Sequence, residues 1–321
     1  MFGYVVHRLL TGCITLIAVT VLVFLLLRVL PGDAAVMMTG AGAGVVSEEE
    51  LQQVRQRMGL DRPLPVQLAE WSWNAATLDF GTSLRTGNAV MADIARRLPF
   101  TLQIVVMAIL MAVCIGVPAG VTAARHQGTW IDRTLQTVTI IGLAAPSFWI
   151  GLLIILGLVK LFQWSAPLFW EPFWSNPLQS FSQLIWPALA VALRQVALTA
   201  RLTRSVMLEV LGEDYIRTAR AKGLSERRVV FRHGLWNASL PIVTLVGFEF
   251  ATLFGNLVVT ETVFSVPGLG QYVVTSILNR DYPAAQGVVL LLACIVVVGN
   301  LTVDLLYGWL DPRIRLQRSG A

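Results

Sequence analysis

Three arginines interrupt one otherwise apolar stretch, and their type and spacing suit charge pairing or the binding of a polar ligand. Arg194, Arg201 and Arg204 are seven and three positions apart, so a helix carries all three on one face. Charges in apolar surroundings are costly, and they tend to pair or to face a path for polar molecules. The partners of these arginines must come from other stretches of the chain.

Glu249 and Asp304 lie in two other apolar stretches. If each stretch is a helix that crosses a membrane, rising about 1.5 Å per residue, Glu249 lies near the midplane at the depth of Arg194. Asp304 and Asn300, one turn apart, lie at the depth of the other two arginines. We expect Arg194 to pair with Glu249, and Asp304 to pair with one of the inner arginines. The residue pattern leaves open whether these side chains only pair or also line a translocation path.

The sequence contains no recognisable catalytic or nucleotide-binding constellation. Three cysteines lie far apart within apolar stretches, with no Cys-x-x-Cys pair, and only three histidines are present. No Gly-x-x-x-x-Gly-Lys-Ser/Thr loop is available to hold phosphates. We therefore expect neither an enzyme nor a chain that binds a metal or cofactor of its own.

The composition predicts an integral membrane protein. Of the 321 residues, 55% are hydrophobic and 13% are charged, whereas soluble domains carry about 25% charged residues. The net charge is +5, but the basic residues lie in loops between apolar runs, not in a patch with aromatic partners. Membrane topology explains this distribution better than nucleic-acid binding does.

Six apolar runs are long enough to cross a bilayer, which takes about 20 residues. They cover approximately residues 9–30, 99–124, 134–159, 184–205, 237–262 and 284–307. The fourth is weak because it carries the three arginines. Keeping it leaves 1, 2, 8 and 3 Lys and Arg residues in the four cytoplasmic segments and one in each short outer loop. We therefore predict an all-α protein with six transmembrane helices, an uncleaved first helix and both termini in the cytoplasm.

The segment after the first span is polar and is expected to form a small extracytoplasmic helical unit. Short helices are predicted over 47–58 and 66–78. The chain thus divides into residues 1–97 and a five-helix core over 98–321. At the outer end of the fifth span, Glu261 precedes a turn at 267–270 and a short helix over 271–279. That helix either caps an outer gate or is an ordinary surface element.

The cytoplasmic stretch 206–236 is expected to fold into two short helices that form a compact knob. The first extends to Lys222, and Gly223 can close it as a C-terminal cap. Ser225 begins the second helix, with Glu226 in its first turn. Such a knob suits docking into a groove on a partner protein. The alternative is an ordinary basic loop that only fixes the topology.

This stretch resembles the EAA loop of ABC importer permeases, whose pattern is Glu-Ala-Ala, three residues, Gly and a later Leu-Pro. The matching positions are Arg217-Thr218-Ala219, Gly223 and Leu240-Pro241. Arg217 replaces the Glu, Thr218 replaces the first Ala, and the distance from Gly to Pro is about five residues longer than in the short consensus pattern. The run from Asp214 to Leu224 is similar to the form found in the dipeptide, oligopeptide and nickel branch. The resemblance implies that the ATPase-coupling residues are Arg217, Thr218, Ala219, Lys222, Gly223, Leu224 and Ser225.

Other segments resemble the first permease subunit type of the same branch, so the similarity covers nearly the whole chain. They are residues 5–10, 28–33, 78–83, 146–149, 261–270 and 311–315. The resemblance implies a type I ABC importer permease in the bacterial cytoplasmic membrane. It also implies a second homologous permease, two cytoplasmic ATPase subunits or domains that use ATP, and an extracytoplasmic substrate-binding protein.

The substrate that the resemblance favours is a di- or oligopeptide, although nickel and glutathione importers share the same motifs. A different class, a self-sufficient secondary transporter or channel, would carry internal repeats around broken helices. No clear repeat between the two halves of the sequence is visible. The candidate residues for a path or for intramembrane pairing are Arg194, Arg201, Arg204, Glu249, Glu261, Asn300 and Asp304.

Overall fold

The computed structural model describes residues 2–29, 49, 52, 56 and 61–310. The helix expected over 47–58 falls largely outside this part of the chain, as does the closing motif at 311–315. The second helix expected in the outer segment is present as α4 (Leu64–Ala76). The short helix expected after the fifth span is also present, as α13 (Leu269–Leu278).

Long apolar helices dominate the described residues and confirm the all-α membrane fold. Five are long and apolar enough to cross a bilayer, and a bent pair of shorter helices is apolar and long enough when taken together, which gives six if the pair is one span. They are α1 (Phe2–Val29), the α5–η1–α6 run (Val90–Arg125), α9 (Pro177–Leu211), the α11–η2–α12 run (Glu226–Phe264), α14 (Tyr282–Leu310), and the pair α7 (Trp130–Ala144) and α8 (Ser147–Phe162).

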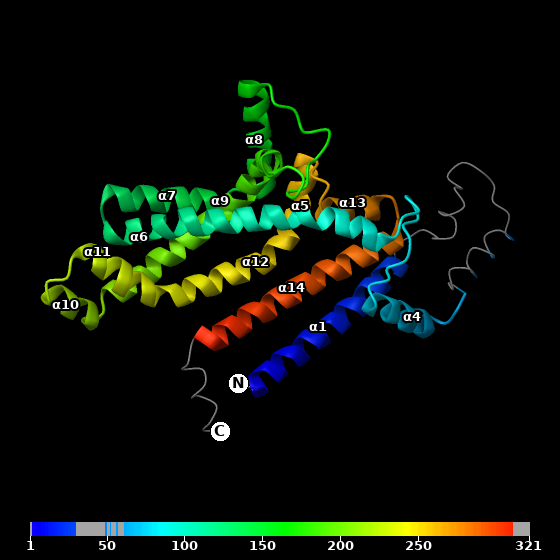
Figure 1. Cartoon of the computed structure of the whole chain (residues 1–321), viewed down its shortest axis with the longest axis horizontal. Helices are drawn as coiled ribbons and strands as arrows, with labels where there is room; N and C mark the ends of the chain where they lie inside the picture. The colour runs from blue at the N-terminus through cyan, green and yellow to red at the C-terminus, as the bar shows by residue number, and fades with distance from the viewer. Residues whose placement is uncertain (1, 30–48, 50–51, 53–55, 57–60, 311–321) are drawn as a thin grey trace.

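The third predicted span is broken, which corrects the expectation of one continuous helix over 134–159. The axes of α7 and α8 differ in direction by 102°. Ala145 has φ −79° and ψ 124°, the extended conformation that a residue before proline prefers, and Pro146 follows it. In Figure 1, α8 therefore points away from the bundle that contains α7.

The arginine-bearing helix α9 is the centre of the bundle. It packs against α5, α6, α7, α8 and α12. Its contact with α6 is close because Gly120 has no side chain: a Cβ there would lie 2.5 Å from the Ala200 carbonyl oxygen. Small residues that let backbones approach are the usual way in which membrane helices pack tightly. The span with the weakest hydropathy, α9, is thus the one that packs against most of the other helices.

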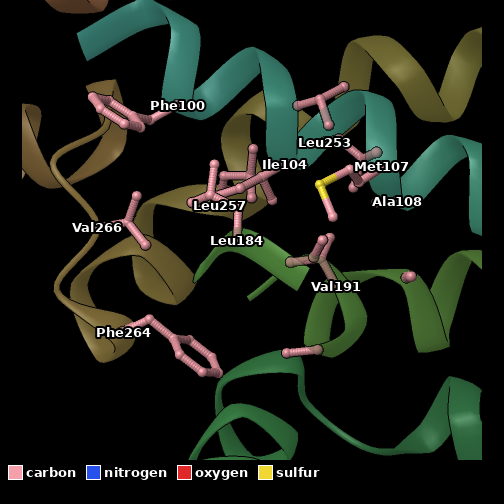
Figure 2. Packing of buried hydrophobic residues seen from close by; sticks show 14 of the residues in the cluster. Phe100, Ile104, Met107, Ala108, Leu184, Val191, Leu253, Leu257, Phe264 and Val266 are labelled. Carbon is pink, nitrogen blue, oxygen red and sulfur yellow. The ribbon is translucent and has the colours of Figure 1, made fainter. Parts of the chain in front are cut away.

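Apolar side chains from three helices fill the middle of the bundle. Figure 2 shows Ile104 of α5, Leu184 and Val191 of α9, and Leu253 and Leu257 of α12 converging on one another. All five are at most 3% exposed. Lipid is as apolar as these side chains, so van der Waals contact and not escape from water stabilises this packing.

The knob, the beginning of α1 and the end of α14 lie toward one end of the long helices in Figure 1, and α4 and α13 lie toward the other. At the α4 end, Asp281 is buried, accepts a hydrogen bond from the Leu84 backbone N–H at 3.1 Å and is bonded by the Ser83 hydroxyl. Phe80 packs on Gly287, where a Cβ would lie 2.8 Å from its ring. The segment before α5 is thereby fastened to α14.

Candidate functional site

The knob at residues 206–236 has a small apolar core of its own. Its two helices are α10 (Asp214–Ala221), which follows α9 after a two-residue turn, and α11 (Glu226–Arg228). Ile216 and Ala219 of α10 pack with Val229, and Leu224 packs against this group from the corner between the helices. Leu224 is half-buried, so part of its surface remains on the outside of the knob.

Gly223 makes the corner of the knob possible. Its φ is +76°, a conformation that residues with a Cβ rarely adopt. Its N–H donates to the Arg220 carbonyl at 2.9 Å, and the Leu224 N–H donates to the Ala219 carbonyl at 3.3 Å. This is the usual glycine termination of a helix, as the sequence predicted. A Cβ at Gly223 would meet nothing within 4 Å, so the backbone angle, not the available space, requires glycine.

The second helix of the knob is continuous with the fifth span, which the sequence did not reveal. After α11 the chain passes through a π-helical segment, η2 (Val229–Leu235), and enters α12 (Trp236–Phe264) without a break. The Ser225 side chain makes no capping hydrogen bond, but its carbonyl accepts from the Arg228 N–H at 2.8 Å. The knob is therefore joined to α12 by continuous helix and to α9 by the short turn at Gly212.

The predicted coupling residues divide into a surface set and a packing set. Arg217, Thr218, Lys222, Gly223 and Ser225 are exposed, whereas Ala219 is buried and Leu224 is half-buried.

An ion pair of 2.8 Å between Arg220 and Glu226 links the two knob helices and was not predicted. The hydrogen bond from this pair raises the pKa of Arg220 above its usual value. Three large aromatic side chains are also exposed on or next to the knob: Tyr215, Phe231 and Trp236.

Of the two arginines nearest the knob, Arg204 has a partner different from the one expected. Arg204 forms a two-pronged ion pair with Asp132 of α7, with Nε to Oδ1 at 2.7 Å and Nη2 to Oδ2 at 2.9 Å. Asp132 is 2% exposed and also accepts from the Gly128 N–H and the Gln136 side chain. The spans predicted from the sequence leave Asp132 in the loop between residues 124 and 134. An acidic residue in the first turn of a helix is favourable, and this was the sequence feature that could have placed Asp132 at the beginning of α7.

Asp304 pairs with Arg8 of α1 at 3.1 Å, and not with Arg201 or Arg204. The reason is that α1 packs beside α14, which brings the beginning of one helix to the end of the other. Arg201 is exposed and forms no ion pair with any residue the structure describes. Asn300 is exposed on α14.

The expected pair between Arg194 and Glu249 is also absent from the described part of the chain. Arg194 lies on the exposed side of α9, whereas Glu249 is 5% exposed and faces the interior. Equal depth in the membrane therefore did not bring the two side chains together, because they point in different directions around their helices.

A buried polar layer lies between two apolar clusters of the bundle. Gln195, Thr199 and Thr203 are spaced four residues apart on α9, and each is at most 1% exposed. Within the described residues, both amide atoms of Gln195, the Thr203 hydroxyl and Oε2 of Glu249 have no hydrogen-bond partner. A π-helical turn, η1 (Ala112–Gly116), packs against α9 at Thr199. Unsatisfied buried groups and π-helical turns are both enriched where proteins change shape or function.

Glu261 forms a clasp at the α13 end of the bundle. It is fully buried and accepts hydrogen bonds from the Thr101 hydroxyl at 2.7 Å and the Gln271 N–H at 3.0 Å. The Thr101 hydroxyl oxygen in turn accepts from the Leu269 N–H at 2.8 Å. A Cβ on Gly268 would lie 2.3 Å from the Glu261 carboxyl carbon, so the glycine is needed for this close approach. Glu261 thus joins α5, α12 and α13.

Tyr272 of α13 lies at the same end of the bundle. Burial, together with the nearby Asp93 carboxylate, raises the pKa of Tyr272 well above its usual value. The neutral phenol donates a hydrogen bond to Asp93 at 3.4 Å, and the Arg97 guanidinium lies 4.5 Å from the ring centre. These contacts fix α13 against α5 and support the clasp.

Comparison with known proteins places this architecture in a family. The family described as binding-protein-dependent transport system inner membrane component matches residues 116–316, and its N-terminal companion matches residues 1–105. A probable peptide ABC transporter permease protein of Sinorhizobium fredii is 40% identical over 312 residues, 97% of this chain and 99% of that protein.

Two further relatives are similar over a comparable length. A putative peptide transport system permease protein of Brucella abortus is 38% identical over 315 residues, 98% of this chain and 99% of the relative. The dipeptide transport system permease protein DppB of Escherichia coli is 37% identical over 342 aligned positions, which cover 98% of this chain and 99% of that protein. The chain therefore belongs to the family of binding-protein-dependent transport system inner membrane components, which are multi-pass transport permeases and not enzymes.

Proposed function

We propose that the chain is the membrane-spanning permease subunit of an ATP-driven importer that moves di- or oligopeptides into the cell. The relatives named above are described as peptide or dipeptide permeases and match almost the whole chain, which supports the peptide substrate. A permease of this family works with ATPase and binding-protein partners. The observation that carries the proposal is the knob at residues 206–236, which is continuous with two central helices.

The complete assembly that we propose contains a second, homologous permease and two cytoplasmic ATPase subunits or domains. An extracytoplasmic binding protein delivers the peptide. ATP is bound and hydrolysed by the partners, and this chain binds no cofactor. The knob, the N-terminus and the C-terminus lie in the cytoplasm in this proposal, and α4 and α13 lie on the side that receives the binding protein.

The knob acts as the mechanical link in this proposal. The exposed positions Arg217, Thr218, Lys222 and Ser225 form the docking surface, and Gly223 holds the corner in shape. When the ATPases close on ATP, they displace the knob. Because α10 follows α9 and α11 continues into α12, the displacement reaches the two helices that pack together at the centre of the bundle.

Substitutions at the knob corner test this role. Gly223→Val forces a β-branched residue into φ +76°, and Leu224→Asp puts a charge against the small core of the knob. We expect peptide uptake into proteoliposomes containing the whole transporter to fall at least tenfold, with ATP hydrolysis no longer responding to the loaded binding protein. Gly87→Val is the matched control, because Gly87 has φ +70° and open space around it but lies far from the knob.

Two results would contradict the proposal. Normal uptake in both knob variants would exclude a docking role, and peptide uptake by the isolated chain without ATP would point to a secondary transporter or channel. Running the same assay with nickel and with glutathione tests the substrate class. Uptake of either one in place of dipeptides would overturn the peptide assignment while leaving the docking role intact.

A further inference from the structure

A cavity of about 550 Å³ lies between α6, α7 and α9, apart from the knob and the clasp. Small side chains make it hollow, since α6 contributes Ala119 and Ala123 and α9 contributes Ala200. Leu135 and Ile140 of α7 form the opposite wall. The walls of the cavity are thus about equally polar and apolar, and the polar part comes from side chains of α7 and α9.

The cavity carries one positive charge that the described chain does not neutralise. Arg201 and Arg204 both line it, but Arg204 is held by the Asp132 carboxylate. Arg201 makes no ion pair within the residues described. The exposed Ser205 lies one turn further along α9 and also lines the cavity. A cationic side chain within a membrane-crossing helix is costly unless an anion is near it, so this wall of the cavity favours an anionic ligand.

The apolar wall of the cavity continues onto the exposed surface of α7, where apolar side chains favour contact with another apolar group. Ile140 lines the cavity and is 62% exposed, and its neighbours Val138 and Ile141 are 59% and 62% exposed. Trp130, 75% exposed, stands at the beginning of α7, where tryptophan commonly marks the membrane interface. The ligand therefore needs an anionic end near Arg201 and an apolar end along α7.

A peptide substrate fits this cavity less well than a lipid does. The free ammonium of a peptide requires an acceptor, and the carboxylate nearest the cavity already receives bonds from Arg204, Gln136 and the Gly128 N–H. Arg204 neutralises the negative charge of this carboxylate. A lipid phosphate requires only cationic and hydroxyl donors, and basic pockets between transmembrane helices on the cytoplasmic side bind anionic headgroups.

We propose that this cavity binds an anionic phospholipid of the leaflet on the knob side. The phosphate contacts the Arg201 guanidinium and the Ser205 hydroxyl, and one acyl chain follows Ile140 along α7. Because α7 and α9 both border the cavity, the bound lipid stabilises their contact beside the Asp132–Arg204 ion pair. Removal of the lipid loosens this contact near the end of α9 that leads into the knob.

The test uses the full chain in detergent, titrated with phosphatidylglycerol or phosphatidylcholine and observed by native mass spectrometry. We expect wild type to retain phosphatidylglycerol at least tenfold more strongly than phosphatidylcholine, and Arg201→Gln to lose this preference. Arg194→Gln is the matched control, because Arg194 lies on the same helix, is exposed and has no ion pair among the described residues, yet does not line the cavity. It should behave as wild type.

A second variant keeps the test independent of the charge. Ala119→Phe fills the cavity while retaining Arg201, and it should reduce phosphatidylglycerol retention as much as Arg201→Gln does. Arg201→Lys keeps the positive charge and should preserve part of the phosphatidylglycerol retention. Equal retention of the two lipids, or equal losses in the Arg194 and Arg201 variants, would overturn the proposal. So would displacement of the lipid by inorganic phosphate alone, which would identify a soluble anion, or Arg201-dependent retention of a dipeptide in its place.

Discussion

At the scale of single residues, the Thr101 hydroxyl is the contact on which the Glu261 clasp depends. It donates to Glu261 and accepts from the Leu269 N–H, so one small side chain joins three helices. Thr101 is 1% exposed, and no water can replace its hydroxyl without a change in packing. The clasp is therefore sensitive to changes that preserve the shape of this residue but remove its hydroxyl.

Thr101→Val keeps the shape and removes both hydrogen bonds. A buried carboxylate oxygen and a buried N–H lose a partner, at a cost of about 1–3 kcal/mol each. We expect the thermal unfolding midpoint of the purified chain in detergent to fall clearly, while Thr101→Ser, which keeps the hydroxyl, stays close to wild type. A valine variant as stable as the serine variant would show that the clasp contributes nothing.

Sequence reasoning recognised some of these residues and missed others for identifiable reasons. Glu261 could be singled out because an acid at the end of an apolar run is unusual. Thr101 gave no signal, because threonine is common in apolar helices. The pair predicted between Arg194 and Glu249 was wrong because depth along a helix follows from residue counts, whereas direction around it depends on which neighbours the helix packs against.

At the scale of elements, the Asp132–Arg204 ion pair connects α7 to the central helix α9. Removing one member of a buried pair leaves the other charge uncompensated, which costs about 3–5 kcal/mol, and Arg204 with 23% of its side chain exposed favours the lower end. We expect Asp132→Ala and Arg204→Ala each to destabilise the chain strongly. The double variant should be more stable than the sum of the two losses predicts, by about 0.5–3 kcal/mol.

A double-mutant cycle on unfolding in detergent measures this coupling. Asp214→Ala with Arg217→Ala is a suitable comparison, because that pair is exposed on the knob at 3.3 Å and should show coupling of about 0.5 kcal/mol or less. Strict additivity at Asp132 and Arg204 would mean that the ion pair does not hold α7 on α9.

The elements themselves were predictable to different degrees. Apolar length located the five long spans and the bent α7–α8 pair, and the excess of basic residues on one side justified keeping the arginine-bearing span, which proved to be the central helix. Hydropathy could not reveal the 102° change of direction, because it averages over a window and carries no backbone angle. Pro146 was the local signal for the break, since it excludes its predecessor from the helical region.

At the scale of the whole molecule, the α13 end and the middle of the bundle are built differently. Glu261 and Asp281 fasten the segments at the α13 end to the bundle, while the polar layer around Gln195 leaves groups that have no partner among the described residues midway along α9. The two helices that meet at this layer, α9 and α12, are the two that enter the knob. Motion imposed on the knob is therefore expected to be accommodated at the polar layer while the clasp remains closed.

The direction in which this molecule crosses the membrane is open to a direct test. In a background with the three cysteines replaced by alanine, Ser225→Cys places a thiol on the knob and Ser175→Cys places one in the loop before α9, and both serines are exposed. A membrane-impermeant maleimide added to intact bacteria should label the position 175 variant and leave the position 225 variant unlabelled until the membrane is permeabilised. Labelling of the knob variant in intact cells would reverse the orientation, place the knob out of reach of any cytoplasmic ATPase, and thereby remove the basis for its coupling role.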